Sequence, residues 1–307
     1  YGLTLSNDPQ SPGFIELNLK RNNMIGVLTN TILQLSNSSL LSIDLSHNKL
    51  NNDFSNTKYT IDLSKNKKLT SLDLSNNQLN GKLPSSVYRT ISSSHSNTEL
   101  IHLDFSHNKL TGTLSANIAK CTQLHVIKLN NNKMAGTIPK SIEKLVLLED
   151  FDISYNKFTS TVPMQLFTLT HLQHLFLNDN RFTGTLSNTI LTKCSDLLEL
   201  KCHNNQFKGS LPLPMGISSS SSTSTSGSSS DGNDNSGSSG NSAIQHINMG
   251  YNRFTGSIPS SLDGLSGLTM LDVGYNLLTG EVPDLTVVGV GDRVALEFKY
   301  YGNNDLE

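Results

Sequence analysis

Apolar residues recur along this chain in a short pattern that ends at an asparagine. Between Leu124 and Leu129 apolar and polar side chains alternate, and Asn132 follows three residues later. This alternation predicts a short strand with one apolar face, ended by a bend at the asparagine. The same asparagine position occurs ten times along the chain, at Asn22, Asn48, Asn77, Asn108, Asn132, Asn156, Asn180, Asn205, Asn252 and Asn276.

The spacing of these asparagines predicts the architecture. From Asn108 to Asn180 the interval is 24 residues at every step. A fixed period of about 20–50 residues indicates stacked coils that each contact only their neighbours. An asparagine amide can bond to backbone groups that the bend and the adjacent coil leave without partners. We therefore predict that the ten asparagines form a structural hydrogen-bond ladder and take no part in recognition.

Glycine and proline complete the repeat. Most units place a glycine four residues after the asparagine, namely Gly81, Gly112, Gly136, Gly184, Gly209, Gly256 and Gly280. Six units add a proline, at Pro84, Pro139, Pro163, Pro212, Pro259 and Pro283. The resulting pattern L-x-x-L-x-L-x-x-N-x-L-x-G-x-I-P resembles the plant-type leucine-rich repeat over residues 14–283.

This resemblance implies an α/β fold. The expected structure is a right-handed leucine-rich repeat solenoid with a parallel β-sheet on its concave face and with turns and short 3₁₀ or α pieces on its convex face. It also implies that residues 1–13 are the remnant of an N-terminal cap, in which Leu5 stands where the family's cap has a cysteine.

Composition divides the chain further. The repeats are predicted at 14–212 and 244–283, separated by a Ser/Gly-rich insertion at 213–243 whose composition is typical of a flexible loop. A smaller bulge is expected at Ser85–Asn97. Residues 284–307 leave the repeat pattern, so we predict a C-terminal cap that covers the last core. Tyr1 begins inside a motif, so we expect the sequence to be part of a longer protein.

Charge and apolar content exclude several classes. The formal net charge is −2 and no long basic run occurs, which argues against nucleic-acid binding. No apolar stretch is long enough for a membrane span. The three cysteines, Cys121, Cys194 and Cys202, lack metal or disulfide spacing and are predicted to be buried apolar side chains. One glycosylation sequon begins at Asn37.

The strand residues that point away from the core are the candidates for binding. Stacked coils place equivalent residues about 4.8 Å apart, so these positions form columns across the sheet. Asp44, Asp73, Asp104, Asp152 and Asp272 repeat the family's common filler and are interpreted as structural. Units that depart from this filler lie in a patch of aromatic and charged residues, the kind of composition that binds a protein, peptide or glycan. The patch consists of Asp150, Asp152, Tyr155, His174, Phe176, Asp179, Glu199, Lys201, His246 and Tyr251.

The same outward positions also bear on metal binding and catalysis. Asp150, His174, Glu199 and His246 are metal-ligand types, but a flat sheet does not converge four ligands on one point, so neither a metal nor a cofactor is predicted. No nucleophile, oxyanion-binding group or phosphate loop accompanies them, so no catalysis is predicted.

A second candidate face carries threonines at 24-residue spacing. They resemble the threonine arrays of ice-binding solenoids, an activity found in some plant leucine-rich repeat proteins, although threonine is common there throughout the family. The threonines are Thr111, Thr113, Thr137, Thr159, Thr161, Thr183 and Thr185.

Together these observations favour non-catalytic recognition on the concave face. The resemblance implies the ectodomain of a receptor-like protein or receptor kinase, located outside the cell or at its surface. A free-standing inhibitor or scaffold, similar to the polygalacturonase-inhibiting proteins and with an intracellular location still open, is the alternative. Ice binding is a further alternative.

Overall fold

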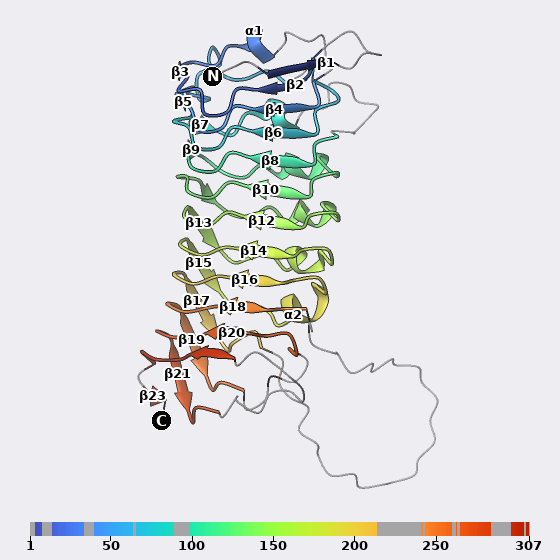
Figure 1. Cartoon of the computed structure of the whole chain (residues 1–307). Helices are drawn as coiled ribbons and strands as arrows, with labels where there is room; N and C mark the ends of the chain where they lie inside the picture. Colours follow the sequence, from blue (N-terminus) through green and yellow to red (C-terminus); the bar gives the residue numbers. More distant parts are fainter. Residues whose placement is uncertain are drawn as a thin grey trace, which may run out of the picture.

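The computed structural model describes the repeats and both ends of the array. The described residues are 4–7, 14–33, 40–63, 66–88, 99–213, 241, 243–259, 262, 265–283, 296–303 and 305–306. Asn37 and most of the 213–243 insertion lie outside them. Figure 1 shows short strands stacked one above another along a single long axis.

The main sheet runs the length of the molecule. Within the described residues it has twelve strands in the order β1-β2-β4-β6-β8-β10-β12-β14-β16-β18-β20-β22. All neighbours pair in parallel except β1 with β2, which are antiparallel. The strands are β1 (Thr4–Asn7), β2 (Phe14–Asn18), β4 (Ser42–Asp44), β6 (Ser71–Asp73), β8 (His102–Asp104), β10 (Val126–Lys128), β12 (Asp150–Asp152), β14 (His174–Phe176), β16 (Glu199–Lys201), β18 (His246–Asn248), β20 (Met270–Asp272) and β22 (Glu297–Lys299).

Short helices lie on the opposite side of the coils, each a single turn or slightly more. They are α1 (Asn30–Leu33), η1 (Ser85–Tyr88), η2 (Ala116–Lys120), η3 (Lys140–Lys144), η4 (Met164–Thr168) and α2 (Thr189–Lys193), where η marks 3₁₀ geometry. The predicted leucine-rich repeat solenoid, with a parallel sheet and short 3₁₀ or α pieces, is therefore confirmed. No helix in the described part of the chain is both long and apolar enough to cross a membrane.

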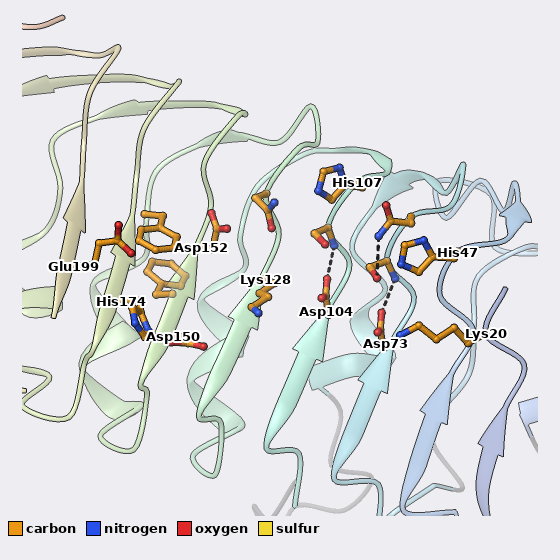
Figure 2. A pocket seen from close by; sticks show the side chains of 16 residues that line it. Lys20, His47, Asp73, Asp104, His107, Lys128, Asp150, Asp152, His174 and Glu199 are labelled. Atoms are coloured by element: carbon orange, nitrogen blue, oxygen red, sulfur yellow. Dashed lines mark hydrogen bonds and ion pairs between the residues drawn. The ribbon is translucent and has the colours of Figure 1, made fainter. Parts of the chain in front are cut away.

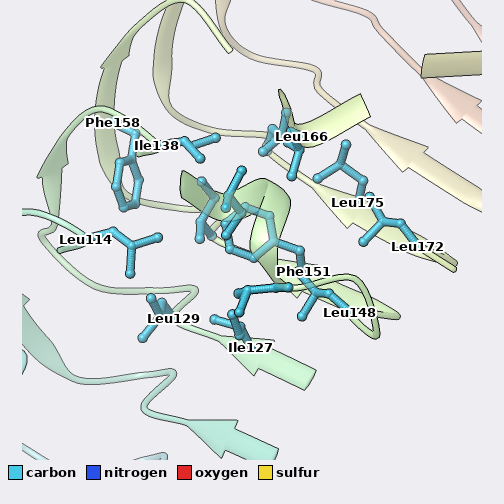
Figure 3. Close-up of a cluster of buried hydrophobic side chains, with 14 of the residues drawn as sticks. Leu114, Ile127, Leu129, Ile138, Leu148, Phe151, Phe158, Leu166, Leu172 and Leu175 are labelled. Carbon is cyan, nitrogen blue, oxygen red and sulfur yellow. The ribbon is translucent and has the colours of Figure 1, made fainter. Parts of the chain in front are cut away.

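The core lies between the sheet and these helices. Figure 3 shows its middle, where Ile127, Phe151 and Leu175 point inward from consecutive strands toward Leu166 of η4. All four side chains are fully buried. Burial of an aliphatic or aromatic side chain of this size stabilises the fold by about 1.5–3 kcal/mol, so each coil depends on its neighbours to exclude water.

The ladder asparagines bond from one coil to the next. Asn156 is typical: its Nδ2 donates to the carbonyl oxygens of Leu129, Ile153 and Ser154 at 2.9–3.2 Å. Its Oδ1 accepts from the backbone N–H of Met134 at 2.9 Å. In the first repeat, the side chain of Asn22 donates only to Lys20 of its own coil among the described contacts, while its backbone N–H donates to Asn48 Oδ1 of the next coil.

An eleventh rung occupies the segment predicted as the C-terminal cap. Asn303 Oδ1 accepts from the backbone N–H groups of Asn276 and Leu278, each at 3.1 Å. Its Nδ2 donates to Val273 and Tyr300. Since β22 also pairs in parallel with β20, the described part of residues 296–306 has the hydrogen bonding of one more coil.

The insertion is anchored at both ends. Leu213 and Asn241 are buried, at 2% and 5% exposure, although the sequence places both inside the 213–243 insertion. Asn241 Nδ2 donates to the carbonyl oxygens of Cys194 and Leu197 at 2.7 and 3.0 Å. The packed solenoid therefore extends to Leu213, one residue beyond the boundary that composition predicts. After the insertion, residues pack against it again from Asn241.

A second row of parallel strands, which the sequence pattern led us to expect as turns, runs beside the main sheet (Figure 1). Its seven-stranded part contains β11 (Ala135–Gly136), β13 (Lys157–Ser160), β15 (Arg181–Gly184), β17 (Gln206–Gly209), β19 (Arg253–Gly256), β21 (Leu277–Gly280) and β23 (Asp305–Leu306). Two strand pairs precede it: β3 (Ile25–Gly26) with β5 (Lys49–Leu50), and β7 (Asn80–Lys82) with β9 (Lys109–Thr111).

Phenylalanines explain why these segments extend. Phe158, Phe182, Phe207 and Phe254 point inward and are fully buried. Successive rings lie nearly parallel, with centroids 6.0–6.2 Å apart. Each of these strands buries one large ring between neighbours that face outward, and this alternation favours strand geometry over a loose turn.

Candidate functional site

The outward columns of the main sheet are in strict register. Asp150 pairs with His174, His174 with Glu199, and Glu199 with His246. The adjacent column runs Asp152, Phe176, Lys201 and Asn248 in the same strands. Residues along a strand alternate between the two faces of the sheet, so each strand has two outward side chains with a buried residue between them. That buried residue fixes the strand against the core and thereby holds both outward side chains in place.

A groove crosses these columns in the N-terminal two thirds of the sheet. Its volume is about 610 Å³, and it extends from Lys20 after β2 to Glu199 in β16 (Figure 2). The lining residues are Lys20, His47, Asp73, Ser75, Asn76, Asp104, Ser106, His107, Lys128, Asn130, Asp150, Phe151, Asp152, His174, Phe176 and Glu199.

The groove contains half of the patch that the sequence suggested. Asp150, Asp152, His174, Phe176 and Glu199 line it. The other five residues, Tyr155, Asp179, Lys201, His246 and Tyr251, lie beyond its lining, toward the C-terminal end or on the turn that follows each strand.

Ion pairs order the C-terminal end of the groove. His174 Nδ1 contacts Asp150 Oδ1. Lys201 Nζ lies 2.7 Å from Glu199 Oε1 and 4.6 Å from the centre of the Phe176 ring. The His174 ring centroid lies 6.0 Å from that of Phe176. Phe176 is thus a partly exposed aromatic side chain with the Lys201 ammonium over its ring.

The middle of the groove places one lysine between two fixed carboxylates. Lys128 pairs in register with Asp104 on one side and Asp152 on the other. Ser154 donates to Asp152 Oδ1 from its backbone N–H and its hydroxyl, and the Ser106 backbone N–H does the same for Asp104. Burial raises the pKa of both carboxyls, and the serine hydrogen bonds oppose that rise. One oxygen of each carboxylate is fixed, which leaves the other available to a ligand.

A second group of contacts surrounds Asp179. Asn178 and Asn204 donate to its two oxygens at 2.8 and 2.9 Å, and His203 Nε2 lies 3.6 Å away. The Asp179 charge, together with some burial and a hydrogen bond to Asp179, raises the pKa of the Tyr155 phenol. Burial lowers the pKa of His203. Both Asp179 oxygens are satisfied internally, which makes this group a weaker candidate for ligand contact, while His203 Nδ1 is buried without a hydrogen-bond partner in the described part of the chain.

Tyrosines form a third group near the C-terminal end. Tyr251 and Tyr275 stack with centroids 4.2 Å apart, and Tyr301 meets Tyr275 edge-on at 5.4 Å. All three are exposed by 42–56%. Tyr251 was singled out from the sequence, whereas Tyr301 was assigned to the cap.

The metal-ligand types in the patch separate into pairs. Asp150 contacts His174, while Glu199 is 3.7 Å from His246 and also binds Lys201. Among the described residues no group of three or more histidine, cysteine, aspartate or glutamate side chains is arranged to hold a metal ion.

Sequence reasoning missed the N-terminal half of the groove. Asp73 and Asp104 resemble filler, and Lys20, His47 and His107 were not combined with the patch. The signal was present in the same columns, because His107 and Lys128 depart from the commonest residues at their positions. The sequence does not show at which coils the surface is hollowed into a groove.

Repeats and fold both identify leucine-rich repeats. The Leucine Rich Repeat family model matches residues 68–89, 99–121, 171–192 and 243–265. A comparison with curated proteins finds no significant match. The chain is a leucine-rich repeat solenoid, and its repeats are similar to those of plant leucine-rich repeat receptor ectodomains.

Solved structures of plant proteins share the fold. The ectodomain of the membrane receptor kinase GASSHO1/SCHENGEN3 from Arabidopsis thaliana, in complex with CASPARIAN STRIP INTEGRITY FACTOR 2, is 26% identical, with a TM-score of 0.66 over 88% of this chain and 31% of that one. The complex PEPR1-AtPEP1 is 22% identical, with a TM-score of 0.61 over 87% and 39%. A plant ice-binding protein is 20% identical, with a TM-score of 0.74 over 98% and 84%. The chain thus spans well under half of the two receptor structures.

Proposed function

We propose that the chain is a non-catalytic recognition module whose main-sheet groove binds a peptide segment carrying basic side chains. The groove itself carries this proposal, because it crosses eight successive coils from Lys20 to Glu199. At about 4.8 Å per coil, seven intervals span roughly 34 Å, the length of about ten residues of extended peptide.

The charges of the groove favour a basic ligand. Five carboxylates line it, on Asp73, Asp104, Asp150, Asp152 and Glu199, against two lysines and three histidines. With the histidines neutral, the lining has an excess of negative charge. Lys20 is also partly neutralised by Asp44, 3.6 Å away. Phe176 offers a partly exposed ring at one end, and aromatic anchors of this kind often contribute most to affinity.

The comparisons support the same conclusion. The GASSHO1/SCHENGEN3 ectodomain was solved with a bound partner, and it is among the more similar structures in sequence. By that likeness we place the chain at the cell surface or outside the cell. A membrane span or kinase encoded beyond Glu307 would support a receptor, and a mature end near Glu307 would support a free-standing inhibitor or scaffold.

Ice binding is the second candidate, for one observation. Thr159, Thr183, Thr255 and Thr279 are exposed at equivalent places on β13, β15, β19 and β21. Ala135 and Lys208 interrupt this column, and lysine or arginine side chains flank it. Purified protein that shows thermal hysteresis would establish this activity, and its absence at high concentration would exclude it.

Selection from a random peptide library tests the principal proposal. Peptides enriched on the wild-type chain should be basic, and they should lose affinity for a His174→Ala/Phe176→Ala variant. The matched control is Val146→Ala/Met164→Ala, which removes two exposed apolar side chains from the helical side. Enriched peptides that bind both variants equally, or a library that yields none, would refute the groove as the site.

A further inference from the structure

The outer face of the second row of strands is basic from β5 to β19. Strands β5 to β21 of this row contain no aspartate or glutamate. Eight cations lie on these strands or within two residues before one, and all are exposed: Lys49, Lys82, Lys109, Lys133, Lys157, Arg181, Lys208 and Arg253. The chain as a whole has a net charge of −2, so this face is a local concentration of positive charge.

Six of the cations follow a ladder asparagine directly and therefore form one row. They are Lys49, Lys109, Lys133, Lys157, Arg181 and Arg253. The strands step by two residues from coil to coil, so that Lys157 lies beside Ala135 and Arg181 beside Thr159. From Lys109 to Arg181 the cations lie on successive coils and are thus diagonal neighbours about 7–8 Å apart. Gln78 and Gln206 occupy the equivalent position on the coils between Lys49 and Lys109 and between Arg181 and Arg253. Lys208 lies directly beside Arg253 and widens the row.

These cations have no acidic partners in the described part of the chain. The main-sheet lysines differ, since Lys20, Lys201 and Lys299 each lie within 2.7–3.6 Å of a carboxylate. In the basic row the nearest equivalent contact is from Lys109 Nζ to the neutral amide oxygen of Gln78 at 3.3 Å. Neighbouring like charges repel one another, and a negatively charged ligand outside the chain would relieve that repulsion.

The remaining side chains indicate the kind of anion. The aromatic residues of β13, β15, β17 and β19 all point inward, so these four strands present no outward ring on which a nucleobase could stack. Between the cations lie hydroxyl groups, including those of Thr159, Thr183 and Thr255.

We propose that this basic row binds a linear polyanionic polysaccharide whose sugars carry carboxylate or sulfate groups. The regular spacing of the cations fits a ligand with regular charge, and the threonine hydroxyls can exchange hydrogen bonds with sugar hydroxyls. The row lies on different strands from the groove, so a polysaccharide and a peptide could bind at the same time.

The test compares four polymers on the intact chain. Dextran sulfate supplies sulfate groups, alginate supplies carboxylates, neutral dextran is the uncharged control, and poly(U) represents nucleic acid. Affinity is measured by biolayer interferometry at low and at physiological salt. The row variant is Lys133→Gln/Lys157→Gln/Arg181→Gln. Its control, Lys140→Gln/Lys144→Gln/Lys193→Gln, makes the same charge change at exposed lysines of η3 and α2.

We expect the wild-type chain to bind one or both charged polysaccharides but not dextran. The row variant should lose about tenfold or more in affinity at low salt and should show a weaker salt dependence, while the control stays within about twofold of wild type. Equal losses in the two variants would reduce the effect to net charge and overturn the proposal. Tighter binding of poly(U) than of either polysaccharide, or no binding to any polymer at low salt, would also overturn it. Equal unfolding midpoints for the two variants verify that both are folded.

Discussion

Asn156 accepts a hydrogen bond from the backbone N–H of Met134, which lies 22 residues earlier in the chain and one coil away, at a distance of 2.9 Å. The same side chain donates to Leu129 in that earlier coil and to Ile153 and Ser154 in its own. Asn156 therefore joins two coils through backbone groups that water does not reach.

Asn156→Ala should destabilise the solenoid by about 2–4 kcal/mol, because it leaves a buried N–H and buried carbonyl groups without partners. A lower midpoint of urea unfolding measures this effect. Asn117→Ala, at an exposed position of η2, should leave the midpoint nearly unchanged. Ligand binding by the folded fraction of Asn156→Ala should persist. Loss of binding without loss of stability would show that the ladder acts in recognition.

Gly302 allows the ring of Tyr275 to lie against the last coil. Its φ is +77°, and an added Cβ would lie 2.5 Å from Tyr275 Cδ1. Gly302→Ala should therefore loosen the last coil by about 1–3 kcal/mol. Hydrogen exchange should become faster in residues 296–303 and stay unchanged in the central repeats near residues 102–160, since each coil contacts only its neighbours. A uniform rise along the chain would contradict this local account.

Burial of the Asp152 carboxyl gives a prediction for pH. Its folded-state pKa is raised, so protonation favours the folded state. This contribution is fully present below the unfolded pKa and is lost as pH rises through the folded pKa. Asp152→Asn keeps an oxygen that can accept from Ser154 and removes the buried charge. The variant should unfold at a higher temperature than wild type at pH 7, and the difference should shrink toward pH 3. Exposed Glu143→Gln is the control, and a difference independent of pH would contradict the explanation.

The cysteines should be unreactive in the folded protein. Cys121, Cys194 and Cys202 are fully buried. Burial raises the pKa of the Cys194 thiol to about 12 and also raises that of Cys202, which leaves almost no thiolate at pH 8. A thiol reagent such as Ellman's reagent should label none of the three within minutes in native buffer, and all three in urea. Rapid native labelling of any cysteine would show that its coil opens.

The features that the sequence predicted depend on nearby side chains, whereas the features that it missed depend on contacts between coils. Local periodicity predicted the strands, the bends at the asparagines and the burial of the three cysteines, because each depends on side chains a few residues apart. The second row of strands was missed, since Lys157–Ser160 pairs with Arg181–Gly184 through backbone bonds that no side-chain pattern announces. Asn303 was missed because the segment before it lacks the leucines of the repeat.

The candidate site divides in the same way. Register alone brings Asp150, His174 and Glu199 together, so alternation along the strands was enough to find them. The depth of the groove at Asp73 and Asp104 depends on the size of side chains in several coils at once. A residue type that is common at its repeat position, such as Asp73 or Asp104, can therefore still line a groove. How often a residue type occurs at that position does not reveal this role.

Photo-crosslinking tests the central claim, that the main-sheet groove is the peptide site, most directly. A library-selected basic peptide with a photoreactive residue is cross-linked to the intact chain, and the modified positions are mapped by mass spectrometry. The account predicts cross-links on the outward residues of coils β8 to β16, and their loss in His174→Ala/Phe176→Ala. Cross-links confined to the second row of strands or to the helical side, or unchanged in that variant, would contradict it.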